Sequence, residues 1–211
     1  MPGVAVNRLP PGRHGLSRDE VTGSQRERML RGMVDAVSER GYAVVTVADV
    51  IKRAGVSRET FYEQFANKED CFMAAYDAIV VSLLKALGEE ISPPPGADAG
   101  GLRDLLDRII GRYLDELNET TLAWAFLIEI NAAGPAAVKR RAEAQTRGME
   151  AIAAALGASD ARQRFACDAL FVTIVGIATH RVAAGKTENL AELRERMVEF
   201  AHSTLRTVGI E

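Results

Sequence analysis

The sequence has few of the residues and motifs on which enzymes and metalloproteins usually depend. Its 211 residues include two distant cysteines, Cys71 and Cys167, and three dispersed histidines, His14, His180 and His202. Cysteines this sparse argue against a disulfide framework or a zinc site. There is no GxGxxG, no phosphate loop ending in Gly-Lys-Ser/Thr and no HExxH, so motifs for nucleotide or zinc chemistry are missing. We therefore expect no catalytic residue, no metal and no cofactor.

Long apolar runs are missing as well. The most apolar stretch, residues 170–178, is bracketed by Asp168 and Arg181 and is far shorter than the roughly 20 residues that span a bilayer. Residues 1–23 hold no run that could form a signal-peptide core,. The sequence thus predicts a cytoplasmic protein with no membrane partner.

Neither sign of charge dominates. The chain has 26 Lys and Arg against 29 Asp and Glu, for a formal net charge of −3. Residues 1–70 contain 11 basic and 10 acidic side chains. A nucleic-acid partner would therefore have to be recognised by local placement of charge and not by the total.

Helical patterns, in contrast, extend along most of the chain. Four helix starts are predicted from capping residues, three of them with an acidic residue three positions on: Ser24 with Glu27, Thr46 with Asp49, Ser57, and Asn67 with Asp70,. Gly41 and Gly55 stand where C-caps end the first two of these helices,. Starts this closely spaced are unusual outside a helix-turn-helix unit.

The second half of the chain predicts a helical bundle. Apolar periodicity and breakers indicate helices over residues 102–117, 121–132, 135–156, 160–183 and 190–208,. The fold class is therefore all-α, with a helix-turn-helix domain over residues 24–70 and a bundle over 71–211. Residues 1–23, which contain prolines, glycines and scattered arginines, are predicted to be a flexible arm.

The segment 47–70 is the most informative part of the chain. Its apolar residues are spaced to form the inner faces of two crossed helices, with Gly55 supplying a bend of positive φ,. The groups left for the outer surface are Ser57, Arg58, Thr60, Tyr62, Gln64 and Lys68. A short helix that presents such groups fits a major groove of DNA, with the preceding helix across the phosphate backbone.

These residues resemble a known family. The patterns T-V-x-D-[IV]-x-x-x-A-G-V-S, T-F-Y-x-x-F and N-K-E-D, within residues 46–76, closely resemble the DNA-binding head of the TetR (tetracycline repressor) family of bacterial regulators. The resemblance is specific over residues 25–76. Beyond them the chain agrees with the family only in being a helical bundle of suitable length.

The resemblance implies roles for the matched positions. Thr46 would cap the second helix and hold a phosphate. Arg58 and Thr60 would approach bases or phosphates, and the Tyr62 hydroxyl would bond a phosphate. Lys68 would contact the DNA backbone at the start of the fourth helix, where the helix dipole favours an anion.

Two positions depart from the family pattern, which often has His, Arg or Tyr where this chain has Glu63 and Gln64. Base specificity therefore cannot be transferred, although Gln64 could read adenine. Two other positions keep a structural alternative: Tyr62 as a half-buried aromatic residue, and Lys68 as a solvated charge.

The resemblance also implies a homodimer on a palindromic operator. In the family the last two long helices form the interface, for which segment 170–178 and its Gly176 are candidates. The final helix adds an apolar stripe of Leu193, Met197, Phe200, Ala201, Leu205 and Val208. The alternative is that segment 170–178 is a central core helix.

A small, largely apolar effector is implied among the middle helices, with residues 71–211 binding it and forming the dimer. The candidate pocket residues combine apolar surface with a few polar atoms: Tyr113, Trp124, Glu129, Met149 and Phe171. The predicted function is a transcriptional regulator, more specifically a repressor. The alternatives are a small-molecule-binding protein or enzyme on the same scaffold, and a structural dimer whose head no longer binds DNA.

Overall fold

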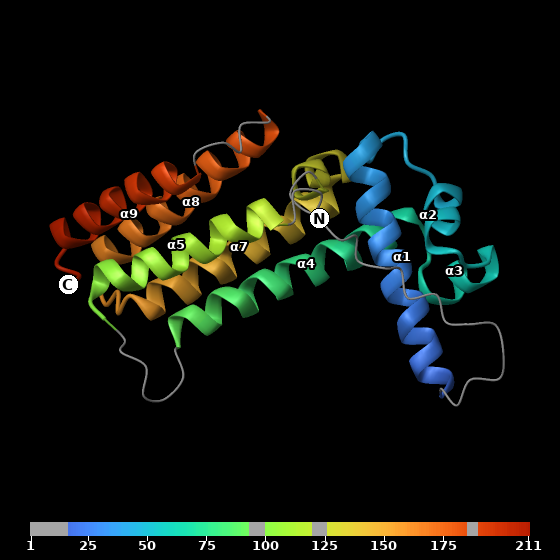
Figure 1. Cartoon of the computed structure of the whole chain (residues 1–211), viewed down its shortest axis with the longest axis horizontal. Coiled ribbons are helices and arrows are strands. Elements are labelled where there is room, and N and C mark those ends of the chain that lie inside the picture. The colour runs from blue at the N-terminus through green and yellow to red at the C-terminus, as the bar shows by residue number, and fades with distance from the viewer. Residues whose placement is uncertain (1–16, 93–99, 120–125, 185–189) are drawn as a thin grey trace.

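The computed structural model describes residues 17–92, 100–119, 126–184 and 190–211, and every regular element in these ranges is a helix (Figure 1). The helices are α1 (Arg18–Arg40), α2 (Val47–Ala54), α3 (Arg58–Gln64), α4 (Lys68–Ile91), α5 (Leu102–Glu119), the 3-10 helix η1 (Glu129–Ala133), α7 (Pro135–Ala155), α8 (Ala161–Ala183) and α9 (Leu190–Thr207). The predicted all-α class is confirmed. The helix predicted over residues 121–132 lies partly outside the described ranges, and its last part forms η1.

Three of the four predicted helix starts are present. The side chains of Thr46, Ser57 and Asn67 each accept a hydrogen bond from the backbone N–H three residues on. The first start is wrong, because Ser17 and Glu20 form the capping box of α1. Residue 24 therefore lies inside α1, which begins at Arg18. The last residues of the predicted arm, 18–23, belong to this helix. Residues 1–16 lie outside the described ranges.

Helices α1, α2 and α3 form a head around a shared apolar core. A Cβ at Gly32 would lie 3.2 Å from the Cβ of Arg53 and 3.3 Å from the Val50 carbonyl oxygen, so α1 and α2 approach closely there. The Arg28 guanidinium of α1 donates to the Ala54 carbonyl at the end of α2, at 2.8 Å. Gly55 follows with φ 63° and ψ 42°, the left-handed conformation predicted for it. The angle of α2 is thereby fixed against α1.

Helix α4 runs out of the head and along the bundle (Figure 1). By length and composition it is the one described helix that could cross a membrane. Its apolar residues have partners within the fold, since Phe72 and Tyr76 lie in the head core and Leu83 and Leu87 line a cavity. We therefore describe α4 as the helix that connects head and bundle.

The bundle consists of the far part of α4 with α5, α7, α8 and α9. Helix α9 packs on α5, and the Arg194 guanidinium binds Asp107 through two hydrogen bonds of 2.8 and 2.5 Å. The guanidinium of Arg194 lies over Gly111, where an added Cβ would clash with it. Most of the predicted interface stripe of α9 is buried inside the subunit: Leu193, Met197, Ala201 and Leu205. That stripe therefore packs in the bundle core, and of its large side chains only Phe200 is exposed.

Candidate DNA-binding helix and ligand cavity

Helix α3 is short and lies on the surface of the head. Ser57 caps it, with its Oγ accepting from the Thr60 N–H at 3.0 Å. Phe61 is fully buried and Phe65 nearly so, and these two rings anchor the helix against α1 and α2. The opposite face of α3 is open to solvent, as a helix that enters a DNA groove requires.

The outward face of α3 carries one cation and one aromatic hydroxyl. The Arg58 guanidinium donates to the Tyr62 hydroxyl at 3.3 Å and lies 5.3 Å from the centre of the Tyr62 ring. Tyr62 is 45% exposed, so its ring is about half covered, as in the structural alternative, while its hydroxyl accepts from Arg58 at the surface. Glu59 and Glu63 are exposed on the same short helix, so positive charge on this face is confined to Arg58.

Thr60 and Thr46 both use their hydroxyls within the head. The Thr60 Oγ1 lies 2.9 Å from the Ser57 Oγ. The Thr46 hydroxyl donates to Asp49 Oδ2 at 2.7 Å and accepts from the Asp49 N–H at 3.3 Å. Hydrogen bonds from the Thr46 hydroxyl and backbone N–H to the Asp49 carboxylate, together with the neighbouring Arg40, lower the pKa of Asp49 from its usual 3.8 to about 2. Thr46 is thus the N-cap of α2, and Thr60 lies in the first turn of α3.

Gln64 does not face outward, in contrast to the prediction. Its Nε2 donates to the Thr22 carbonyl of α1 at 3.3 Å, and its Oε1 is buried without a hydrogen-bond partner among the described residues. The side chain therefore lies between α3 and α1. In this position its amide is bound to α1.

Lys68 is also turned inward. Its Nζ donates to the carbonyls of Tyr42 and Val45, at 2.9 and 3.0 Å, and lies 4.0 Å from the centre of the Tyr42 ring. The ammonium thus clamps the turn between α1 and α2. Neither the phosphate contact nor the solvated charge considered from the sequence describes this placement.

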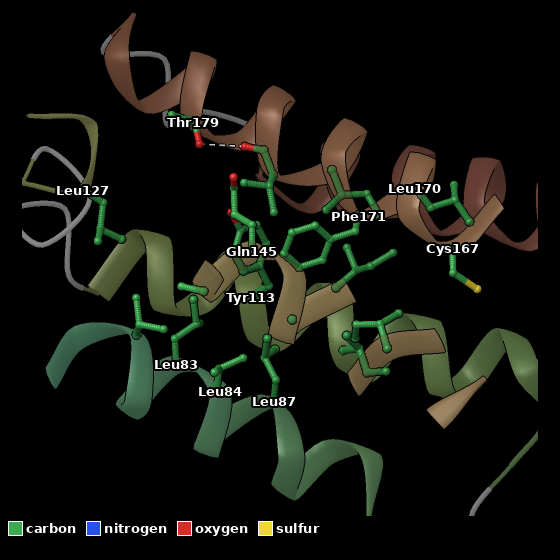
Figure 2. Close-up of a pocket in the computed structure, with 18 of the residues that line it drawn as sticks. Leu83, Leu84, Leu87, Tyr113, Leu127, Gln145, Cys167, Leu170, Phe171 and Thr179 are labelled. Atoms are coloured by element: carbon green, nitrogen blue, oxygen red, sulfur yellow. Dashed lines mark hydrogen bonds between the residues drawn. The ribbon is translucent and has the colours of Figure 1, made fainter. Parts of the chain in front are cut away.

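A cavity of about 280 Å³ lies between α4, α5, α7 and α8. Its walls are largely apolar, and Figure 2 shows Leu83, Leu84 and Leu87 of α4 on one side and Leu170 and Phe171 of α8 on the other. The ring of Phe171 occupies space left by Gly148 of α7, where a Cβ would lie 3.0 Å from the ring. The volume is near the lower end of the range for small-molecule sites.

Two of the five predicted pocket residues line this cavity, Tyr113 and Phe171. Met149 does not line it, and Trp124 lies outside the described residues. The carboxylate of Glu129 points to the head and accepts a hydrogen bond from the Tyr42 N–H at 2.8 Å. A helical pattern shows that a residue is buried, but not on which side of its helix a cavity lies.

The polar residues at the cavity were not predicted. They come from three elements: Asn131, Arg141, Gln145 and Thr179. The Arg141 guanidinium donates to Asn131 Oδ1 at 3.2 Å, and no carboxylate within the described ranges lies within 4.0 Å of it. A mostly apolar site with one cation at its edge can hold an apolar molecule and orient a polar group on it.

Within the described residues, no group of three or more His, Cys, Asp or Glu side chains is placed to hold a metal ion. Cys71 and Cys167 are both buried. Burial raises the pKa of the Cys71 thiol to about 12 and that of Cys167 above its usual value.

A solvent-facing α3 packed against α2, followed by a helical bundle with an apolar cavity, defines a helix-turn-helix protein. Residues 34–75 match the model of the tetR family of bacterial regulatory proteins. The chain therefore carries a tetR-family domain, and the resemblance found in the sequence is confirmed.

Two curated relatives match part of the chain. The uncharacterised HTH-type transcriptional regulator YvdT of Bacillus subtilis strain 168 is 32% identical over 63 residues, which is 30% of this chain and 30% of that protein. The uncharacterised HTH-type regulator YxbF of the same organism is 28% identical over 69 residues, 32% of this chain and 18% of that protein. The match thus spans less than a third of either relative.

Solved structures share the fold over most of the chain. A transcriptional regulator from Rhodococcus sp. RHA1 gives a TM-score of 0.72 at 20% identity and covers 86% of this chain and 96% of its own. The fatty acid degradation regulator FadR from Bacillus halodurans gives 0.73 at 16% identity, covering 84% and 94%. At these identities the likeness concerns the fold, and it extends through the bundle as well as the head.

Proposed function

We propose that the protein is a sequence-specific DNA-binding transcriptional regulator that acts as a cytoplasmic homodimer. It represses transcription by holding a palindromic operator and releases it when a small, largely apolar effector enters the cavity. It is a regulator and not an enzyme. The observation that carries this function is the exposed α3, anchored by Phe61 and presenting Arg58 and Tyr62.

Arg58 and Tyr62 support a role for α3 in a major groove. The guanidinium can bind guanine or a phosphate, and the phenol can donate to a phosphate. Since the head is nearly neutral, overall charge cannot hold it on DNA. The fit of α3 into the groove must therefore bring the Arg58 guanidinium and the Tyr62 hydroxyl to their partners. A second copy of the head on a second half-site then supplies the affinity that one nearly neutral head lacks.

Exposed apolar side chains on α8 and α9 support a second copy of the chain as the partner. Phe165 is 74% exposed and Val172 60%, and with Gly176 they follow a helical spacing along one face of α8. Phe200 of α9 is 52% exposed. Large apolar groups gathered on two helices are typical of an interface, and a two-fold pair of such faces is self-complementary.

The effector is inferred from the cavity. Its leucine, isoleucine and phenylalanine walls favour an apolar body, and Arg141 with Asn131 at the edge favours a polar or anionic group on it. Such a combination provides binding energy from the walls and orientation from the polar groups.

Selection of bound fragments from a pool of genomic DNA tests the proposed function. The purified full-length protein should enrich a palindromic sequence, and its affinity should fall steeply with salt because phosphate contacts release counterions. The double variant Arg58→Ala, Tyr62→Ala serves as control and should enrich nothing. Recovery of no common sequence by the wild-type protein would count decisively against the proposed function.

A further inference from the structure

The 3-10 helix η1 makes contacts in two directions. Leu127 and Ile128, directly before it, and Asn131 within it line the cavity. Figure 2 shows Leu127 at one end of the row of lining side chains. Glu129, in the same turn, points the opposite way and accepts a hydrogen bond from the Tyr42 N–H of the head at 2.8 Å. A single turn of backbone thus lies against both the candidate ligand site and the head.

Both backbone groups of Tyr42 are held, since its N–H donates to the Glu129 carboxylate and its carbonyl accepts from a lysine. Lys68 donates to the carbonyl of the same residue, Tyr42, at 2.9 Å. Gly41, with φ 79°, has no side chain on the side of the carboxylate, where a Cβ would lie 3.3 Å from Glu129 Oε2. The turn between α1 and α2 is therefore clamped to η1 through Glu129 and to α4 through Lys68.

Buried aromatic rings run beside this polar contact. The rings of Phe126 and Phe72 are 4.4 Å apart between centres, and those of Phe72 and Tyr42 are 4.7 Å apart. Phe126 immediately precedes the cavity residue Leu127. A displacement of η1 would thus reach Tyr42 through close-packed rings as well as through the carboxylate.

The clamped turn leads directly to the DNA-binding helices. Thr46, four residues beyond Tyr42, caps α2, and α2 with its Gly55 turn sets the angle of α3. An occupant of the cavity can shift the orientation of the head only through contacts that differ between the two states. The Glu129–Tyr42 bond joins the two regions, because Glu129 stands in the same turn as the cavity-lining residues Ile128 and Asn131, while Tyr42 belongs to the head.

We propose, building on the function proposed above, that Glu129 is a positioning residue that transmits occupancy of the cavity to the α1–α2 turn. A molecule that displaces Leu127 and Ile128 moves η1, draws the carboxylate away from the Tyr42 N–H, and releases the orientation of α2 and α3. The regulation of operator binding thus passes through one side chain of η1.

Hydrogen–deuterium exchange of the full-length protein without DNA tests this link. Glu129→Ala should speed exchange of the Tyr42 amide by at least about tenfold, because the amide loses its acceptor, while amides inside α8 stay protected. Glu143→Ala, which removes an exposed glutamate of α7 that lies 4.0 Å from Lys139, is the matched control and should change nothing at Tyr42. Unchanged exchange in Glu129→Ala overturns the proposal.

A cavity-filling substitution stands in for the unidentified effector. Ala144→Leu adds bulk to the cavity wall and should speed Tyr42 exchange when Glu129 is present, with no further increase in the Glu129→Ala background. Ile152→Phe fills the same cavity from another position and replaces Ala144→Leu should that variant not fold. If the filling substitution speeds Tyr42 exchange by the same factor in the wild-type and the Glu129→Ala backgrounds, transmission through Glu129 is contradicted.

Operator binding provides the second readout. In the protein that keeps Glu129, the cavity-filling substitution should weaken binding to a selected DNA fragment by about fivefold or more, which is within the usual range of allosteric coupling. In the Glu129→Ala background the same substitution should weaken binding by less than about twofold. Equal weakening in both backgrounds overturns the proposal. If the protein selects no DNA at all, the proposed function fails while the exchange result still decides whether cavity and head are linked.

Discussion

At the scale of single residues, side chains that look equivalent in the sequence serve different purposes. Tyr62 and Lys68 were both expected to address phosphate. Tyr62 is exposed on α3, whereas the Lys68 ammonium bonds the Tyr42 and Val45 carbonyls. One is placed to act on a partner and the other to hold the head together.

Paired substitutions separate these two roles. Tyr62→Phe should weaken binding to every DNA sequence by a similar few-fold factor, since one hydroxyl bond is worth roughly 0.5–1.5 kcal/mol, and should leave the melting temperature unchanged. Lys68→Met should lower the free energy of unfolding by about 1–3 kcal/mol, because two carbonyls lose their donor. Fluorescence anisotropy with several DNA sequences and thermal melts measure both. Relaxed preference at one base in Tyr62→Phe, or an unchanged melt in Lys68→Met, contradicts these roles.

Residues of the head also show which contacts can be predicted from the sequence and which cannot. The caps at Thr46, Ser57 and Asn67 could be predicted because they join positions three residues apart. The inward turn of Gln64 could not, because its partner Thr22 is 42 residues away. Lys68 meets Tyr42 at a separation of 26 residues. Local patterns do not specify such contacts.

At the scale of elements, α2 depends on a charged cap. The Asp49 carboxylate accepts from both the backbone N–H and the hydroxyl of Thr46 and pairs with Arg40. These bonds favour the ionised form, so the pKa of Asp49 is about 2 in the folded protein. Since α2 supports α3, the cap also holds the candidate DNA-binding helix in place.

A pH series tests this cap. Because the pKa of Asp49 is lower in the folded state than its usual 3.8, its stabilising contribution is complete above that value and is lost as the pH falls to about 2. The wild-type protein should therefore melt at a higher temperature than Asp49→Asn at pH 5, and the difference should shrink between pH 4 and pH 2. Comparing the two proteins removes the effect of other carboxylates such as Asp107. A difference that stays constant over this range contradicts the assignment.

Elements also explain which predictions were wrong. An apolar stripe shows that a helix buries one face, but not whether it buries that face in its own subunit or against a partner. Most of the stripe of α9 packs inside the subunit, on α5 among others, and the large apolar side chains exposed on the described parts of α8 and α9 are Phe165, Val172 and Ile177 of α8 and Phe200 of the stripe itself. The first helix was placed too late because Ser17 and Ser24 both precede a glutamate at the capping distance.

At the scale of the whole molecule, α4 and η1 connect the head to the bundle. The cavity draws its walls from α4, α5, α7 and α8, whose residues are far apart in the sequence. Its existence could be expected from the apolar middle helices, and two of the predicted pocket residues, Tyr113 and Phe171, line it. Its polar edge at Arg141 depends on how four helices meet, which periodicity alone does not fix.

The central claim is that two copies of α3 lie in the grooves of one operator, and site-directed cleavage tests it most directly. Both native cysteines are buried, so a DNA-cleaving reagent can be attached selectively to Glu63→Cys on the exposed face of α3, with Glu143→Cys on α7 as control. On a fragment recovered by selection, the Glu63→Cys protein should cut in two clusters, one within each half of the palindrome, and the control should not. Cleavage spread evenly along the fragment, or seen equally with the control, would show that α3 does not enter DNA.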